Sequence, residues 1–381
     1  MISNTKDIKY LVISDIHLGK KDRTAEIVRN LNIFFSHYST SSQFSDMDII
    51  FIAGDLFDCL LDMAGEDIHE VSIWLGSLMH FCARHEIKLR ILEGTPSHDW
   101  KQSRISETIA KLLEIPLDFK YIDTLYVEKF DDLNISCLYV PDEWTASTDL
   151  TLDQVKDLME SNNLAHVDIA IMHGMFGFQK PPAAHNIPCH DEASYLSLVT
   201  RFINIGHVHK YSTFERILAQ GSFDRLAMGE EEPKGGIVCS LSNLHGDSFQ
   251  FIENKGAKIY KTIVLKFKDL DKSLLQIERA INKIPNNSFV RIKATKDHPV
   301  YIAFDDLKVK FPMYNFTKKS LEDDEEDILV INKSIDLGAD YTPITISKEN
   351  VVDLLTTEIC GKYTLTEKQL ALLNKTLVDL L

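Results

Sequence analysis

The sequence has little basic charge for its size. Its 381 residues include 41 lysines and arginines against 57 aspartates and glutamates, so the formal net charge is −16. A protein that binds DNA unaided usually carries a basic surface, and this balance argues against tight DNA binding by the chain alone. Bound metal ions and a basic patch on one domain can offset the deficit locally.

No stretch approaches the roughly 20 consecutive apolar residues that a membrane span needs, and residues 1–7 show no signal-peptide pattern. We therefore expect no membrane partner and a cytoplasmic location. The six cysteines form no CxxC pair, so neither a zinc ribbon nor a disulfide framework is indicated. Hydrophobic residues make up 44% of the chain, enough for a large core, and the length predicts more than one domain.

What the sequence does contain is a strand-like apolar run, 10–13, that ends in Ser14-Asp15-Ile16-His17-Leu18-Gly19. Asp15 and His17 leave the strand end two residues apart, so their side chains can point the same way and bind one ion. An isolated Asp-x-His is more often a loop carboxylate and a surface histidine. The motif gains weight only because it recurs.

Later apolar runs end in the same class of ligand. These strand ends are Gly54-Asp55 after 49–53, Glu93–Asp99 after 89–92, His173-Gly174 after 169–172, and Gly206-His207-Val208-His209 after 202–205. Helical spacing of apolar residues in 20–37 and 66–87 separates the first strands and predicts an α/β layer fold. The recurrence indicates a metal site shared by several strands.

This order of motifs resembles that of the calcineurin-like metallophosphoesterase superfamily over residues 8–240. The resemblance implies an α/β protein with a β-sandwich flanked by helices and a site for two divalent metal ions. Mixed nitrogen and oxygen ligands suit manganese, iron or zinc better than calcium. By resemblance, one ion would be held by Asp15, His17, Asp55 and His209. The other would be held by Asp55, His173, His207 and Ser97.

The third strand end departs from the family pattern. The family has Gly-Asn-His-Asp/Glu, whereas this turn reads Gly94-Thr95-Pro96-Ser97-His98-Asp99, with Ser97 in place of the asparagine ligand. A serine hydroxyl is a poorer ligand, and the turn can bring either Ser97 or the Thr95 hydroxyl within reach. The resemblance makes His98 the catalytic group that protonates the leaving oxygen or steadies the phosphate, with Asp99 beside it holding the ring.

Three residues near these motifs have more than one interpretation. Asp58, at the spacing Gly-Asp-Leu-Phe-Asp, is either a second carboxylate of the site or the cap of the following helix. His185 and His190, in a proline-containing loop after His173, are expected to be surface histidines rather than ligands.

Residues 220–238 resemble the segment that closes the catalytic domain of SbcD-type DNA repair exonucleases, a branch that implies Mn2+. From about residue 250 the sequence is rich in lysine, and a helix pattern followed by the alternating run 289–294 indicates a small α+β region. It takes the place of the DNA-capping domain of SbcD-like nucleases, although a solvated lysine-rich face is the alternative. The expected parts are a nuclease domain 1–245, a capping domain 246–320, an acidic linker 321–344 and a helical segment 345–381.

The sequence thus predicts a metal-dependent DNA exo/endonuclease that acts with an SbcC-like SMC-type ATPase in recombination and repair. The two short amphipathic helices of 345–381 cannot bury their apolar faces against each other, so they would bind this ATPase. A homodimer is implied by the resemblance alone. One alternative is another metallophosphoesterase, such as a phosphatase or cyclic-nucleotide phosphodiesterase. The other is a non-catalytic scaffold that does not bind the second metal because Ser97 replaces the asparagine ligand.

Overall fold

The structure is a computed structural model that describes residues 7–37, 46–142, 147–180 and 187–322, and residues 356 and 370. The chain divides into two units, Met1–Lys319 and Ser320–Leu381. Apart from residues 321, 322, 356 and 370, the predicted linker and the predicted partner-binding helices lie outside the described residues.

The first sheet has six strands in the order β12-β11-β1-β2-β3-β4. Its parallel part consists of β1 (Ile8–Ile13), β2 (Ile49–Ala53), β3 (Lys88–Leu92) and β4 (Phe119–Ile122). Two antiparallel strands extend it beyond β1, namely β11 (Gly235–Leu241) and β12 (Ser248–Glu253). The first three predicted strands are therefore confirmed, and the structure shows them as parallel neighbours.

The second sheet also has six strands, in the order β5-β6-β7-β8-β10-β9. Its parallel part consists of β6 (Ile135–Val140), β7 (Ile169–Gly174), β8 (Ile203–His207) and β10 (Ile217–Ala219). The antiparallel edge strands are β5 (Tyr126–Phe130) and β9 (Ser212–Phe214).

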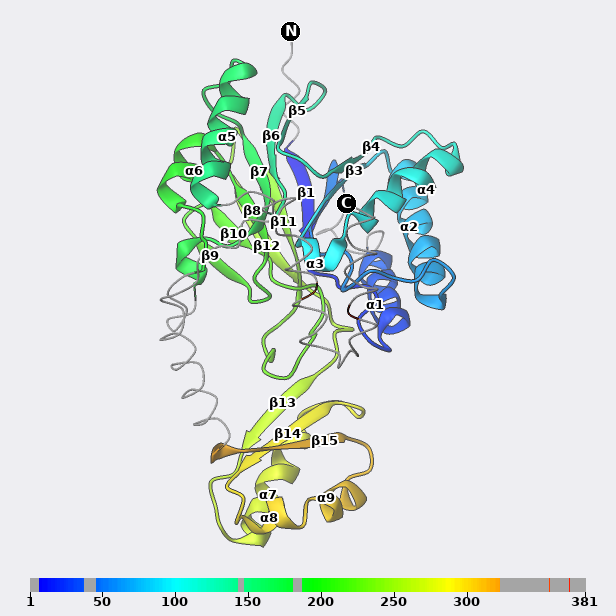
Figure 1. Ribbon diagram of the computed structural model, residues 1–381, viewed down its shortest axis with the longest axis vertical. Helices are drawn as coiled ribbons and strands as arrows, with labels where there is room; N and C mark the ends of the chain where they lie inside the picture. The colour runs from blue at the N-terminus through cyan, green and yellow to red at the C-terminus, as the bar shows by residue number, and fades with distance from the viewer. Residues whose placement is uncertain are drawn as a thin grey trace. The chain divides into compact units, whose positions relative to one another are not determined.

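The two sheets pack face to face, and helices cover their outer faces (Figure 1). Along β1, Tyr10 and Val12 lie in the core between the sheets, whereas Leu11 and Ile13 belong to the core under the helices. The helices on the first sheet are α1 (Thr24–Ser36), α2 (Glu66–Arg84) and α4 (Ile105–Leu113). Those on the second sheet are α5 (Thr148–Ser161) and α6 (Glu192–Leu198). The predicted α/β class is confirmed.

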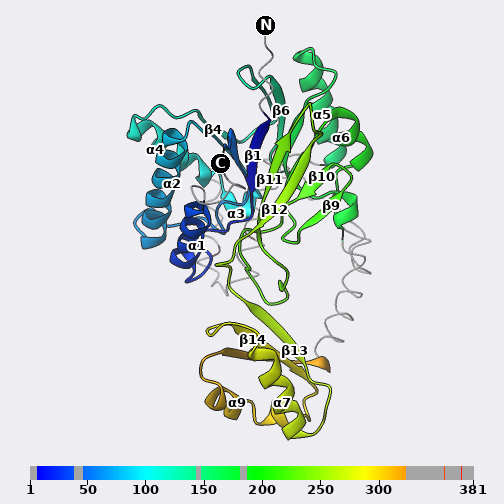
Figure 2. The ribbon, with the colours of Figure 1, turned by 180° about the vertical axis from the view of Figure 1, so that it is seen from behind.

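The lysine-rich region contains a third sheet, in the order β13-β14-β15. Figure 2 shows β13 and β14 with α7. Its elements are β13 (Tyr260–Val264), α7 (Leu270–Ile281), β14 (Phe289–Ala294), α8 (Pro299–Ile302), α9 (Phe304–Lys310) and β15 (Asn315–Ser320). Ile277, Val290 and Leu307 are part of a separate hydrophobic core. The alternating run 289–294 is confirmed as a strand, while the boundary at residue 246 stays a prediction.

In the part of the chain that the structure describes, no helix is long and apolar enough to cross a membrane. Even α2, at 19 residues, has Glu66, Asp67 and Glu70 near its start and Arg84 at its end. Its apolar residues instead form one stripe that packs on the first sheet, as Val71, Leu75 and Leu78 do.

Candidate metal centre

The candidate ligands lie at the carboxyl ends of parallel strands in both sheets. Asp15 and His17 follow β1, Asp55 follows β2, and His173 and His207 lie at the ends of β7 and β8. The carboxyl ends of parallel strands meet at one edge of a sheet, where ligands are usually bound. The backbone N–H of His207 donates to Asp15 Oδ1 at 3.0 Å, which joins the edges of the two sheets at this point.

Four of these residues have left-handed backbone conformations, with φ of 50° at Asp15, 55° at His17, 49° at Asp55 and 99° at His207. Residues other than glycine rarely adopt this backbone conformation, which costs on the order of 1–3 kcal/mol. Such residues concentrate at functional sites. Backbone hydrogen bonds hold the turns: Asp15 N donates to Gly54 O, and His17 N donates to Asp55 O, each at 3.1 Å.

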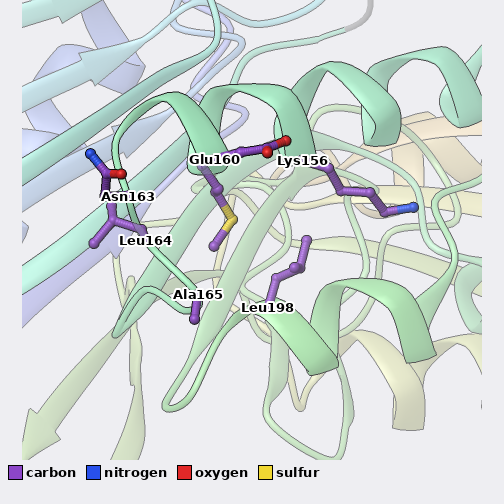
Figure 3. Close-up of a pocket in the computed structure, with 7 residues that line it drawn as sticks. Lys156, Glu160, Asn163, Leu164, Ala165 and Leu198 are labelled. Carbon is purple, nitrogen blue, oxygen red and sulfur yellow. The ribbon is translucent and has the colours of Figure 1, made fainter.

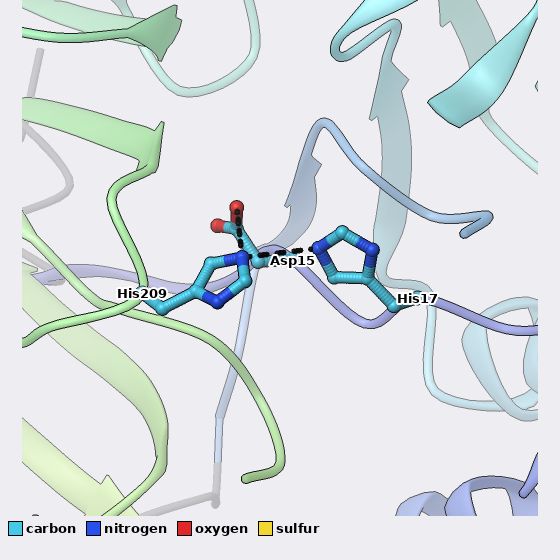
Figure 4. Close-up of side chains that lie close together, drawn as sticks. All are labelled: Asp15, His17 and His209. Atoms are coloured by element: carbon cyan, nitrogen blue, oxygen red, sulfur yellow. Dashed lines mark hydrogen bonds and ion pairs between the residues drawn. The ribbon is translucent and has the colours of Figure 1, made fainter. Parts of the chain in front are cut away.

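The first cluster is formed by Asp15, His17 and His209 (Figure 4). The Nε2 atoms of His17 and His209 lie 3.2 Å apart, and His209 Nε2 lies 3.8 Å from Asp15 Oδ1. Asp15 and His17 are buried, while His209 is partly exposed and leaves the cluster open on its side. The Nε2 atoms and the carboxylate therefore surround one point at the protein surface.

The other ring nitrogen of each histidine is bonded to a carboxylate. His17 Nδ1 lies 3.0 Å from Asp58 Oδ1, and His209 Nδ1 lies 3.0 Å from Glu230 Oε1. Because carboxylates accept, both Nδ1 atoms carry protons, and in the neutral rings the two Nε2 lone pairs face each other. A cation between them removes this repulsion. Two nitrogens bound to one ion at about 2.1 Å lie about 3.0–3.4 Å apart for bond angles of about 90–109°.

The second cluster is formed by Asp55, His173 and His207. His173 Nε2 lies 3.2 Å from Asp55 Oδ1. The Thr95 hydroxyl lies 3.3 Å from both His173 Nε2 and His207 Nδ1, and it donates to Asp55 Oδ2 at 3.2 Å. Burial, followed by the charge of His173, lowers the pKa of His207, so its ring is neutral and can act as a ligand.

Asp55 lies between the two clusters. Its Oδ1 faces His173 in the second cluster, and its Oδ2 lies 3.8 Å from His17 Nε2 in the first. Burial alone would raise the pKa of Asp55, but the charges of His173 and His17 outweigh it and hold the pKa well below its usual range. The pKa of His173 is raised by the same pairing, which outweighs its complete burial. Asp55 thus has the position and charge of a carboxylate shared by two ions.

The ring of His173 is fixed in the way that metal-binding histidines usually are. Its Nδ1 donates to the carbonyl oxygen of Ala53 at 2.8 Å, so Nε2 is the nitrogen that faces Asp55. His17 and His209 are held in the same way, since their Nδ1 atoms are hydrogen-bonded to Asp58 and Glu230. In all three histidines, the Nδ1 atom is therefore hydrogen-bonded to an acceptor outside the cluster. Such partners fix the tautomer and the ring orientation before an ion binds.

Glu230 was not assigned to the site from sequence. It is far from Asp15 in sequence and lies in a loop before β11, where no strand-end pattern marks it. Its Oε2 lies 3.1 Å from Lys234 Nζ and accepts from Leu226 N at 3.0 Å. Burial would raise the pKa of Glu230, but the bond to His209 and that from Leu226 lower it to about 2, so the residue is charged.

Two glycines allow the strand ends to approach each other. Gly54 has a φ of 83°, and a Cβ there would overlap the His173 ring. A Cβ on Gly94 would overlap the backbone nitrogen of Asp55. Glycine in the Gly54-Asp55 and Gly94-Thr95 turns is therefore required by the close packing of the candidate ligands.

The turn after β3 corrects the expectation for Ser97. Ser97 is exposed in α3 (Pro96–Asp99), and its carbonyl oxygen accepts from Trp100 Nε1 at 2.8 Å. Thr95 instead contacts Asp55 twice, since its backbone N–H also donates to Oδ1 at 2.6 Å. Pro96 begins a helical turn directly after Thr95, so the hydroxyl that reaches the cluster is that of Thr95 and not that of Ser97.

The structure also corrects the expectation that Asp99 holds the His98 ring. Asp99 is fully buried and accepts from Phe57 N at 2.8 Å and from Gly94 N at 2.7 Å, so it fastens the turns after β2 and β3 together. Burial, with the negative charge of Asp55, raises its pKa well above the usual range. His98 Nδ1 donates to the Asp58 carbonyl oxygen at 2.9 Å. Successive residues of a helical turn point about 100° apart, which separates the two side chains.

The carboxylate of Asp58 belongs to the site and does not cap the following helix. It lies 3.0 Å from His17 Nδ1 and 3.1 Å from Lys20 Nζ, whereas the cap position of α2 is Gly65. Burial would raise the pKa of Asp58, but the hydrogen bonds from His17 and Lys20 outweigh it and lower the pKa. Asp58 therefore supports His17 through its carboxylate and His98 through its carbonyl.

His190 is not the surface histidine that the sequence suggested. It is only 2% exposed, and its ring packs against Phe176 and Tyr195. Burial lowers its pKa to about 4, so the ring is neutral at physiological pH. His185 lies outside the described residues.

A surface cavity of about 350 Å³ lies away from the candidate ligands (Figure 3). It is lined by the end of α5, the segment that leads into β7, and Leu198 at the end of α6. Leu164 and Ala165 precede β7, whereas His173 lies at its carboxyl end. The cavity therefore opens at the opposite end of the strand from the metal centre and is no part of it.

The comparisons with known proteins do not identify the chain. No protein-family model matches the sequence, and no curated protein matches it. One solved crystal structure aligns with 65% of this chain and 100% of its own, at 13% sequence identity and a TM-score of 0.38. So low a score supports no conclusion about fold or function.

Proposed function

We propose that the protein is a divalent-metal-dependent phosphodiesterase of the calcineurin-like metallophosphoesterase type, and that its substrate is DNA. The observation that carries this proposal is the shared carboxylate, since Asp55 directs one oxygen toward each of two Asp/His clusters. The donors are carboxylate oxygens and imidazole nitrogens, which suit manganese, iron or zinc. The motif resemblance favours two Mn2+ ions.

The cluster residues would hold the ions, with the Thr95 hydroxyl as a neutral oxygen donor of the second site. The chemistry that two such ions would supply is activation of a water nucleophile and neutralisation of charge on the phosphoryl oxygens. His98 supplies the proton for the leaving oxygen. Its Nδ1–H is bonded to the Asp58 carbonyl, which can only accept, so Nε2 is the nitrogen that exchanges a proton with the substrate.

DNA as the substrate is supported by the lysine-rich region. Lys266, Lys268 and Lys272 are exposed around the start of α7, where they can contact phosphates. With a net charge of −16, the chain would hold DNA weakly by itself, so a partner is part of the proposal. By motif resemblance, we propose an SbcC-like ATPase as this partner, a homodimer of the nuclease subunit, and a role in DNA recombination or repair.

Hydrolysis of bis(p-nitrophenyl) phosphate and of short single-stranded DNA tests the proposal. We expect Mn2+-dependent cleavage of both substrates by the wild type. In Asp55→Ala, the rate should fall to that measured with chelator, while the circular dichroism spectrum stays unchanged. Asp153→Ala is the matched control, because Asp153 is an exposed carboxylate on α5 with a side chain 72% accessible. Wild-type activity in Asp55→Ala would contradict the shared-carboxylate assignment. Cleavage of p-nitrophenyl phosphate alone would indicate a phosphatase, and metal binding without any cleavage would indicate a scaffold.

A further inference from the structure

Three exposed apolar side chains lie in the segments after β2 and β3, the same segments that carry Asp55 and His98. Leu60, Met63 and Trp100 are 64%, 71% and 58% exposed, and we refer to them as the apolar rim. Leu60 and Met63 lie in the loop between β2 and α2, and Trp100 directly follows α3. These two segments lie side by side, because Leu61 N donates to Gln102 Oε1 at 2.8 Å.

The Trp100 side chain is held in its exposed position. Its Nε1 donates to the Ser97 carbonyl oxygen at 2.8 Å, which fixes the indole relative to the turn. Trp100 and Lys101 have φ of 49° and 56°, so two consecutive residues adopt the left-handed conformation. Each costs on the order of 1–3 kcal/mol and persists only where the surroundings enforce it. Here the two residues connect the end of α3 to the turn at Gln102–Arg104, and Lys101 N donates to Glu93 Oε1 at 2.5 Å. The turn is thus held from the buried side, while most of the Trp100 side chain faces solvent.

The indole is close to the group proposed to protonate the leaving oxygen. The Cα atoms of His98 and Trp100, two residues apart, are separated by at most about 7.6 Å. The His98 ring packs edge-on against that of His17, with 4.9 Å between the ring centroids. Trp100 is therefore within reach of a group attached directly to the reacting phosphate.

Two lysines near these segments are paired with carboxylates. Lys20 and Lys101 have side chains that are 37% and 47% exposed, and their ammonium groups lie 3.1 Å from Asp58 and 3.5 Å from Asp123. A fixed aromatic face close in sequence to a site for a phosphodiester matches the chemistry of a nucleotide whose base is unstacked. An aliphatic or sugar phosphate has no aromatic ring on which the indole could stack.

We propose that Trp100 stacks on the nucleobase next to the scissile phosphodiester, with Leu60 and Met63 bordering that base. A base inside a duplex has both faces covered by its neighbours, so the site would select a single strand or a frayed end. This inference rests on the proposed phosphodiesterase function and specifies its substrate class.

The test compares two diesters that differ in the base. We would measure kcat/KM with Mn2+ for thymidine 5′-(p-nitrophenyl phosphate) and for methyl p-nitrophenyl phosphate. In Trp100→Ala, the loss on the thymidine ester should exceed that on the methyl ester by roughly 5- to 150-fold, the range found when stacking aromatics are replaced by alanine. Trp100→Phe should recover most of it. The control is Leu112→Ala, which removes a 77% exposed side chain from α4 and should change neither substrate.

Equal losses on the two esters in Trp100→Ala would overturn the stacking proposal while leaving the phosphodiesterase intact. If the wild type hydrolyses neither ester, the proposed function fails, and binding then decides the inference. A thymidine oligonucleotide should quench more tryptophan fluorescence in the wild type than in Trp100→Phe. The same quenching in both proteins, or a change of oligomeric state in Trp100→Ala, would overturn the inference, the latter in favour of a contact between copies of the chain.

Discussion

Replacing Glu230 tests whether the carboxylate behind His209 prepares the first cluster for a metal ion. The bond from His209 Nδ1 is 3.0 Å long, and the Glu230 side chain is only 16% exposed, so water replaces it poorly. Loss of a carboxylate that orients a ligating histidine typically weakens metal binding by roughly 10–100-fold, or about 1.4–2.7 kcal/mol. We expect Glu230→Ala to weaken Mn2+ binding to the first cluster by this amount.

A proton effect acts in the opposite direction and has to be removed. Burial would lower the pKa of His209, but the bond to Glu230, together with the charge of Asp15, raises it. Removing Glu230 therefore lowers this pKa and reduces competition between protons and metal. Titration over a series of alkaline pH values separates the two effects, because proton competition weakens as the pH rises whereas the loss of orientation does not.

The assay is a calorimetric or competitive Mn2+ titration of purified variants. Glu230→Gln keeps an oxygen that can accept from His209 Nδ1, so its loss should be smaller than that of Glu230→Ala. Glu231→Ala is the matched control, because Glu231 accepts from Thr262 N at 2.6 Å and pairs with Lys261, without touching His209. Wild-type affinity in Glu230→Ala, or an equal loss in Glu231→Ala, would refute the reasoning.

Three further predictions concern His98, His173 and the 345–381 segment. His98→Ala should bind Mn2+ normally but lose roughly two to four orders of magnitude in rate; loss of metal as well would make it a ligand. In metal-free protein, pairing with Asp55 raises the pKa of His173 in the folded state. The pairing therefore stabilises the fold fully below about pH 6.5, the pKa of histidine in the unfolded chain, and this stabilisation is lost as the pH rises through the folded-state pKa. The melting-temperature difference between wild type and His173→Gln in chelator should therefore shrink with rising pH, and a constant difference would contradict the pairing. Deletion of residues 345–381 should abolish co-purification with the ATPase while basal Mn2+-dependent cleavage continues; surviving co-purification would rule out this segment as the binding site.

The positions of the candidate ligands were predictable because strands supply a simple geometric rule. Asp15, Asp55 and His173 each follow or end a buried parallel strand, and the carboxyl ends of such strands meet at one edge. The rule needs only local hydrophobic runs, which the sequence displays directly. It does not need the structure of the loops.

The supporting contacts were not predictable by the same rule. Whether Thr95 or Ser97 faces Asp55 depends on where the helical turn of α3 begins. The contact between Glu230 and His209 joins two loops whose paths no local pattern specifies. Asp99 is adjacent to His98 in sequence, but successive residues of a helical turn point in different directions, so its carboxylate accepts from Gly94 N instead. Such contacts depend on the register of loops, which tertiary packing determines.

Metal stoichiometry tests the central claim most directly. Wild-type protein dialysed against Mn2+ and analysed by inductively coupled plasma mass spectrometry should contain two ions per chain. Asp55→Ala should lose ions from both clusters, because Oδ1 and Oδ2 of Asp55 face one cluster each. His209→Ala should lose only the ion of the first cluster, since His209 contacts Asp15 and His17 and no residue of the second. A wild-type chain without bound metal, or two ions retained in Asp55→Ala, would contradict the account.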